Sequence, residues 1–334
     1  MLSRVAEALY WMGRYIERAE DLTRLLAVNF NALLETQPEE ARQGWQPLVK
    51  MTGDEDLFYS LYGEATAQSI AEFLLWHPLN QNAVTACVTR ARENARSVRE
   101  QISSEMWGQL NLLYHLLRDV NKPAVLISPA DFFGQVRDGS QAFQGITAAT
   151  LTHSEAYQFI QLGLFMERAD KTARILDAKY LHINRLEKEG HETALQLIAL
   201  LRSCSAFEPF RRSAMGELNS PRVAEYLLLD QSFPRAVLFC FNRCLHALSQ
   251  IGGEGGLQSK VDHPARSLGR LRADLEYLDI REILGERMDP FLDSLLVRLN
   301  YVGDDVARSY FSTRAILPDS RPQQQQQQQS LATP

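Results

Sequence analysis

A pattern of glycine, glutamate and arginine occurs twice in this chain, and it constrains the fold more than any other feature. Residues 13–20 read GRYIERAE, and residues 163–170 read GLFMERAD. An arginine follows each segment at the same distance, Arg24 in the first and Arg174 in the second. The two segments are therefore 150 residues apart throughout. A fixed separation of this kind is typical of the duplication of one structural unit.

A second pair of segments agrees at nearly the same separation. Residues 71–75 (AEFLL) match residues 224–228 (AEYLL) with a separation of 153 residues. The sequence thus predicts two related halves joined by a Pro- and Gly-containing connection. The expected boundaries are a first helical repeat over 1–120, a connecting segment over 121–150, a second repeat with closing helices over 151–317, and a disordered, Gln-rich tail over 318–334.

Apolar residues recur at helical spacing along most of the chain. The first helix shows this best, with Leu9, Met12, Ile16 and Ala19 spaced by three and four, and it should end near Thr36. The sequence contains no alternating pattern typical of strands. We therefore expect an all-α protein built from two related antiparallel bundles packed together.

Composition excludes several classes of protein. A net charge of -6 argues against general nucleic-acid binding, which needs a basic surface. The four cysteines lack the spacing of a disulfide framework or a zinc site, and no signal peptide or membrane-length apolar run is present. No histidine has a glutamate three residues before it, so a di-metal bundle is not expected. We expect a cytoplasmic protein without metal or cofactor.

The repeated residues form a stripe on one face of each helix. Gly13, Glu17, Glu20 and Arg24 stand at i, i+4, i+7 and i+11, beside the apolar seam. The second copy has Gly163, Glu167, Asp170 and Arg174 at the same spacing. Because glycine inside a helix costs about 1 kcal/mol relative to alanine, its recurrence predicts that another backbone or a ligand comes close there.

Two interpretations of the stripes remain open. In the first, the glutamates form buried ion pairs with arginines on the later helix of the same half. The candidates are Arg90, Arg92, Arg96 and Arg99 in the first half and Arg243 in the second. In the second, Arg18 and Arg168 line a cleft that binds a carboxylate, a phosphate or a peptide.

Two further hypotheses compete with both interpretations. Asp304 and Asp305, together with the segment around Asp119, resemble faintly the aspartate motifs of helical synthases that hold magnesium diphosphate, although Arg308 stands where a further aspartate is needed. A non-catalytic dimerisation scaffold is the other hypothesis. It predicts that neither stripe borders a concave pocket.

Several dispersed motifs together resemble the bacterial alpha-E family, which is defined by a helical domain with a Glu-Arg motif. The motifs are residues 9–20 (LYWMGRYIERAE), 90–96 (RARENAR), 105–107 (EMW), 167–170 (ERAD) and 268–277 (LGRLRADLEY). The resemblance implies a cytoplasmic partner of a circularly permuted ATP-grasp protein, often near a transglutaminase-like protease, in a system that joins carboxylates to amines. It marks Glu17-Arg18 and Glu167-Arg168 as family signature residues, with no activity assigned to them. A homo-oligomer is compatible with this picture.

Overall fold

The protein is all-helical, as the sequence predicts. The computed structural model describes residues 1–33, 38–191, 193–213, 217–252 and 263–311, and no strand occurs among them. The expected tail over 318–334 lies outside these residues. None of the helices described combines the length and the apolar character that crossing a bilayer requires.

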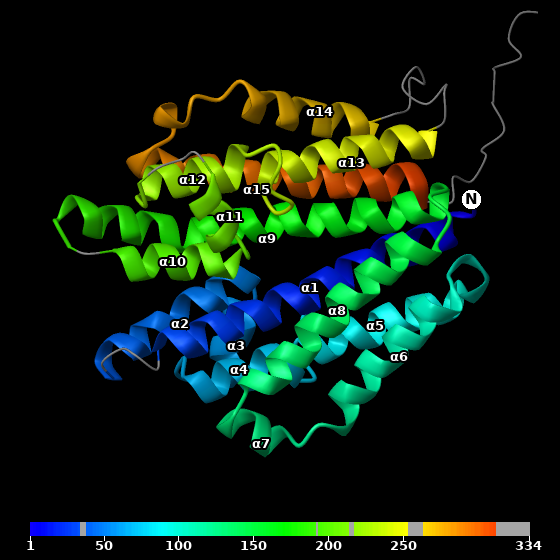
Figure 1. The fold of residues 1–334 in the computed structure, drawn as a ribbon, viewed down its shortest axis with the longest axis horizontal. Helices are drawn as coiled ribbons and strands as arrows, with labels where there is room; N and C mark the ends of the chain where they lie inside the picture. Colours follow the sequence, from blue (N-terminus) through cyan, green and yellow to red (C-terminus); the bar gives the residue numbers. More distant parts are fainter. Residues whose placement is uncertain (34–37, 192, 214–216, 253–262, 312–334) are drawn as a thin grey trace, which may run out of the picture.

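The long helices form two groups of four, one from each half of the chain (Figure 1). The first group is α1 (Ser3–Leu33), α5 (Val84–Ser97), α6 (Ser104–Asp119) and α8 (Ala130–Thr150). The second is α9 (Glu155–Lys188), α13 (Val237–Gly252), α14 (His263–Glu276) and α15 (Met288–Val306). In each group the first helix packs against the second and fourth, and the third packs against the same two. The helices of each group therefore follow one another around a four-helix bundle.

Shorter helices complete each half in a matching order. They are α2 (Pro38–Thr52), α3 (Glu55–Leu61), α4 (Ala67–Trp76) and α7 (Lys122–Ile127) in the first half, and α10 (Ala194–Ser203), α11 (Phe207–Arg212) and α12 (Ser220–Leu229) in the second. Short 3-10 turns cover Arg99–Gln101, Ile280–Glu282 and Gly285–Arg287, and a π-helical turn covers Ala307–Phe311. A residue with positive φ precedes α3 and α11 alike, Gly53 at 75° and Ser205 at 53°.

The segment over 121–150 differs from the expected connection. Most of it is the helix α8, which packs against α1 and α6 and so belongs to the first bundle. Phe132, Val136 and Phe143 of α8 are buried at helical spacing. Its glycines do not end the helix. At Gly139 the missing side chain lets α8 approach α6, since an added Cβ would be 2.4 Å from Leu113, whereas nothing lies within 4 Å of a Cβ added at Gly145. The connection between the halves is therefore the short stretch between α8 and α9.

The two bundles meet where α1 crosses α9 (Figure 1). The apolar seam of α1 faces its own bundle, and Leu9, Met12 and Ile16 are buried there. The opposite side of α1 is also buried because it packs against α9. The charged stripes of both helices lie at this crossing, away from water.

Glycine permits the crossing, as the sequence predicts. A Cβ on Gly13 would lie 2.3 Å from the carbonyl oxygen of Ile160, and a Cβ on Gly163 would lie 2.1 Å from the carbonyl oxygen of Tyr10. Tyr10 and Ile160 hold the same place in their helices relative to the glycines. Each glycine thus contacts the residue that precedes the other glycine by three positions, as in a two-fold interface.

We predict that Gly163→Ala destabilises the protein although alanine favours helix formation. The added methyl group would press on the backbone of α1, which cannot move as a side chain can, so the free energy of unfolding should fall by roughly 1–3 kcal/mol. Gly145→Ala in α8 is the matched control, since nothing lies within 4 Å of its added Cβ. That variant should gain up to about 1 kcal/mol in urea unfolding. Similar gains in both variants would contradict the close crossing.

Candidate functional site

Basic side chains from the first half surround Glu167 of the second. Its buried carboxylate accepts hydrogen bonds from Nε of Arg14 at 2.7 Å and from Nε and Nη2 of Arg18 at 2.6 and 3.0 Å. Lys171, one turn further along α9, lies 3.7 Å away. Arg18 also donates to Oδ1 of Asn82 at 2.5 Å. Glu167 thus obtains its countercharge mainly across the crossing.

Glu17 is held in the reciprocal way by the second half. Its buried carboxylate accepts from Nε of Arg168 at 2.7 Å and from Nη1 of Arg235 at 2.6 Å. The amide of Gln144 donates to the same carboxylate at 2.8 Å, and its oxygen accepts from Nη2 of Arg168 at 2.7 Å. The arginine of each Glu-Arg motif therefore binds the glutamate of the other motif.

A second acidic layer lies beside Glu17. Glu20 accepts from Nη1 of Arg24 at 2.7 Å, from Nη2 of Arg235 at 2.5 Å and from the amide of Gln141 at 3.1 Å. Asp21 accepts from Nη1 of Arg235 at 2.8 Å and from Arg24. One guanidinium, that of Arg235, consequently joins three buried carboxylates.

These three carboxylates lie close enough together to hold a metal ion. Ligand oxygens of Glu17, Glu20 and Asp21 are all within 4.8 Å of one another. The Arg235 guanidinium is bonded to each of them and so supplies the positive charge at that position. The three carboxylates are thus already neutralised by arginine, and they do not offer an open coordination site for a metal ion.

Burial and guanidinium charges shift the pKa values of these acids in opposite directions. Burial alone would raise the pKa of Glu167, but Arg18 and Arg14 outweigh it and hold the pKa well below its usual range. The pKa of Glu20 is lowered in the same way by Arg235 and Arg24. For Asp21 burial dominates and raises the pKa to about 6. Its Oδ2 is buried and accepts no hydrogen bond from the described residues.

The remaining residues of the second stripe pair within α9. Nε of Arg174 donates to Asp170 at 2.9 Å, and Lys171 lies 3.7 Å from the same carboxylate. Glu17, Arg18, Glu20, Arg24, Glu167, Arg168, Asp170 and Arg174 therefore all lie in ion pairs at or beside the α1–α9 crossing.

The arginines expected to pair with the glutamates inside each half lie elsewhere, so this part of the prediction is wrong. Arg90 lies over the Tyr15 ring, and Arg243 lies over the Phe165 ring. Arg92 stacks on Tyr114 and donates to Asn111, and Arg96 pairs with Glu93 near the surface. The reason is geometric: α5 contacts the apolar side of α1, whereas the charged side of α1 faces α9.

Sequence reasoning also missed several members of the network. Arg235 binds the most carboxylates among them. Its counterpart before α5 is Asn82, so a comparison of the two halves does not single out Arg235. Arg14 has Leu164 as its counterpart, and Asp21 has Lys171. Charged residues next to the repeated motif that have no equivalent in the other half were the available indication of the network, because a buried carboxylate needs a positively charged partner from some element.

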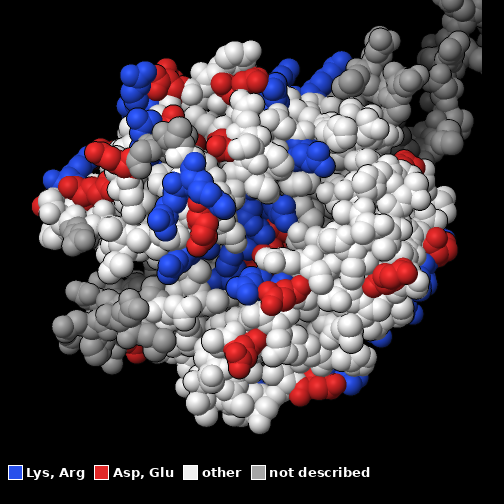
Figure 2. Space-filling view, in the orientation of Figure 1, with Lys and Arg blue, Asp and Glu red and all other residues white. Residues whose placement is uncertain are grey.

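A pocket opens beside Arg168 and Arg235. Its volume is about 590 Å³, and it is lined by Arg168, Ser205, Pro209, Arg212, Ser213, Tyr226, Asp230, Ser232, Phe233, Pro234 and Arg235. These residues belong to α9, to α11 and the residues directly flanking it, to α12, and to the loop between α12 and α13. Figure 2 shows basic side chains gathered at the middle of this face of the molecule. The ion-pair network therefore forms one wall of a space that can admit a ligand.

Comparison with known proteins identifies relatives of this chain. The sequence model of the Alpha-E family, described as a predicted alpha-helical domain with a conserved ER motif, matches residues 1–311. An uncharacterized protein of Mycobacterium bovis is 25% identical over 94% of this chain, and one of Mycobacterium tuberculosis is 24% identical over the same share. The chain spans only 37% of the length of each relative. No solved structure matches the chain.

We predict that the exchanged ion pairs are energetically coupled. In a double-mutant cycle, Glu17→Gln and Arg168→Gln should show a coupling of at least about 1 kcal/mol, because either single change leaves a buried charge without its partner. The control pair is Glu17→Gln with Arg90→Gln, which should be additive within about 0.5 kcal/mol. Coupling of Glu17 to Arg90 instead of Arg168 would contradict the pairing of each motif's arginine with the glutamate of the other motif.

Asp21 should make stability depend on pH. Its raised pKa means that the folded state binds more protons than the unfolded state between about pH 4 and pH 6. The wild type should therefore lose stability relative to Asp21→Asn as the pH rises through this range, by an amount on the order of 2 kcal/mol. Denaturant unfolding of both proteins at several pH values measures this. A difference that does not change with pH would refute it.

Proposed function

Because the chain belongs to the Alpha-E family, we propose that it acts as a substrate-binding component of an ATP-dependent ligation system. The proposed partner is a circularly permuted ATP-grasp ligase, with a transglutaminase-like protease as a possible second member of the system. In this proposal the ligase activates a carboxylate, and the helical protein positions the acceptor or peptide substrate through its Glu-Arg network.

The pocket beside Arg168 is the observation that carries this proposal. The Arg168 side chain is only 11% exposed, and Glu17 and Gln144 bind its Nε and Nη2. The guanidinium is therefore fixed before any ligand arrives, which lowers the entropy cost of binding. The fixed Arg168 guanidinium gives the 590 Å³ pocket a rigid polar wall against which a substrate can be positioned.

The length of the relatives agrees with a larger assembly. Since this chain spans 37% of the mycobacterial proteins, each of them contains much sequence beyond the matching region. We infer that this additional sequence supplies functions that act beside the helical domain.

We also propose that the two halves arose by internal duplication. The matching order of helices in the two halves, with positive φ at both Gly53 and Ser205, supports this proposal.

The two alternatives receive less support. A pure dimerisation scaffold predicts no concave pocket at the stripes, whereas one borders Arg168. For the helical synthase, Asp119 and Asp305 lie in different bundles. Asp305 also accepts hydrogen bonds from Ser267 and Arg308, each at 2.6 Å. These aspartates therefore do not converge on one magnesium site.

We predict that the tagged chain co-purifies with a circularly permuted ATP-grasp protein of the same organism. We also expect that adding it changes the products which that ligase forms from ATP and mixed amino acids. Mass spectrometry of reactions with and without the chain measures the change, and the tag alone serves as the control. Failure to associate, together with identical product spectra, would overturn the proposal.

A further inference from the structure

We propose that the pocket beside Arg168 binds the free carboxylate and the free ammonium group of one small zwitterion, an amino acid or a short peptide. This deepens the proposed function, because it names the class of substrate for that site. The residues that line the pocket all belong to the second half of the chain.

The positive group that remains available is Arg212. It lies at the end of α11, lines the pocket and is exposed, and it forms no ion pair among the described residues. Arg168 and Arg235 line the same pocket but are committed to Glu17, Glu20 and Asp21. A ligand carboxylate can therefore pair with Arg212 without breaking the buried network.

The negative group that remains available is Asp230. Its Oδ1 accepts hydrogen bonds from the backbone amides of Ser232 and Phe233 at 2.8 and 2.7 Å, which fixes the side chain at the pocket wall. Its Oδ2 accepts no hydrogen bond from the part of the chain that the structure describes. This oxygen is free to accept from an ammonium group.

The overall charge of the pocket favours a zwitterion over a phosphate. The pocket and its floor contain four guanidiniums and four carboxylates, those of Arg24, Arg168, Arg212, Arg235, Glu17, Glu20, Asp21 and Asp230. A dianion would add uncompensated negative charge to this balanced site. A molecule with one positive and one negative group preserves the balance and satisfies both uncommitted side chains.

The remaining walls suit the body of such a ligand. Tyr226 and Phe233 stack with ring centroids 5.2 Å apart, and Pro209 and Pro234 add apolar surface. Burial, reinforced by the charge of Asp230, raises the pKa of Tyr226 to about 12. The phenol therefore keeps its proton at neutral pH and can donate to a carboxylate.

The first half contains no such combination of residues. At a separation of 153 residues, Asn82 replaces Arg235 and His77 replaces Asp230. When Gly53 and Ser205, the positive-φ residues before α3 and α11, are aligned, Ser60 replaces Arg212. Tyr62 and His77 instead pack with Phe73 in an aromatic cluster. The binding chemistry is thus confined to the half in which the pocket is open.

Calorimetric titration of the isolated full chain with the dipeptide Ala-Leu tests the proposal without any ligase, so its failure is distinct from failure of the partnership. We expect saturable binding of Ala-Leu. Affinity should fall about tenfold for Ala-leucinamide and severalfold for N-acetyl-Ala-Leu, since each lacks one charged end. Inorganic phosphate should bind more weakly than the dipeptide. No binding of Ala-Leu up to about 10 mM, or tighter binding of phosphate, would overturn the proposal.

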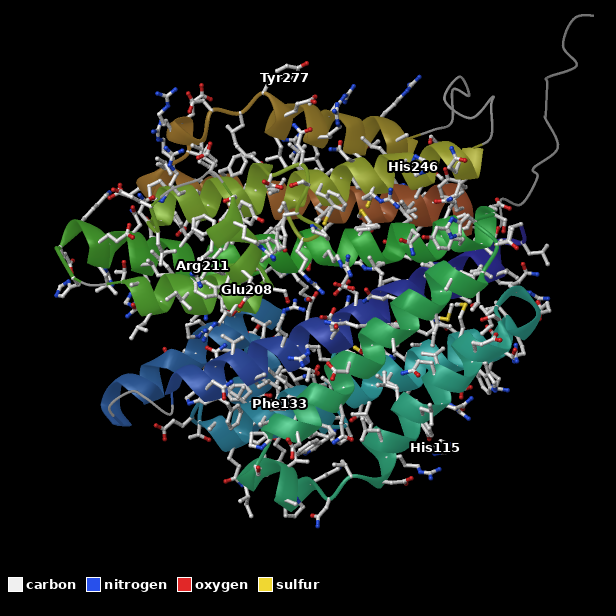
Figure 3. All side chains as sticks on the ribbon, in the orientation of Figure 1. His115, Phe133, Glu208, Arg211, His246 and Tyr277 are labelled. Carbon is white, nitrogen blue, oxygen red and sulfur yellow. The ribbon has the colours of Figure 1, made fainter. Side chains whose placement is uncertain are left out.

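Variants of the protein test separately how the carboxylate end and the ammonium end of the ligand are bound. Arg212→Gln should weaken Ala-Leu binding about tenfold with an unchanged melting temperature, because Arg212 is exposed and forms no ion pair with any residue that the structure describes. Arg211→Gln is the matched control: Arg211 lies on the same helix, α11 (Figure 3), but does not line the pocket. Asp230→Asn should weaken Ala-Leu but leave N-acetyl-Ala-Leu unchanged. Equal losses in the Arg211 and Arg212 variants, or no loss in either, would overturn the assignment.

Discussion

The exchange of ion pairs between α1 and α9 is the interaction on which the rest of this structure depends. Two fully buried glutamates, Glu17 and Glu167, would be strongly destabilising without countercharges. Each receives an arginine from the opposite helix, Arg168 and Arg18 respectively. These short contacts require the two backbones to approach closely, and Gly13 and Gly163 remove the side chains that would prevent it. The ion pairs therefore require the glycines, and the close approach at the glycines is in turn stabilised by the ion pairs.

The ion pairs around Glu167 and those around Glu17 form two clusters that are built in the same way but differ in their charges. Around Glu167 the basic groups Arg14, Arg18 and Lys171 outnumber the carboxylates they contact. Around Glu17 three carboxylates share Arg235. Unlike charges at matched places show that the halves are not equivalent in their chemistry. The pocket lies beside the cluster around Glu17, whose partners Arg168 and Arg235 line it.

Structural and functional interpretations of the Glu-Arg motif are compatible in this protein. Glu17 stabilises the crossing through Arg168, and the same contact fixes Arg168 at the wall of the pocket. A side chain held by two buried partners loses little conformational freedom when a ligand binds. The need to neutralise a buried carboxylate thus also provides a rigid basic surface. Any loss of activity in variants of this motif must therefore be compared with their stability.

The sequence by itself determined the helical class, the apolar face of α1, the stripes and the close approach at Gly13 and Gly163, because helical periodicity and glycine cost are local properties. Only the tertiary structure decided which arginine meets which glutamate. Arg90 and Arg168 are equally plausible partners of Glu17 in the sequence, since pairing across a helix crossing depends on which side of α1 each neighbour covers. The pocket was likewise undetermined, because it is formed by Arg212, Asp230 and other residues distant in sequence that meet only after α11 and the α12–α13 loop fold against α9.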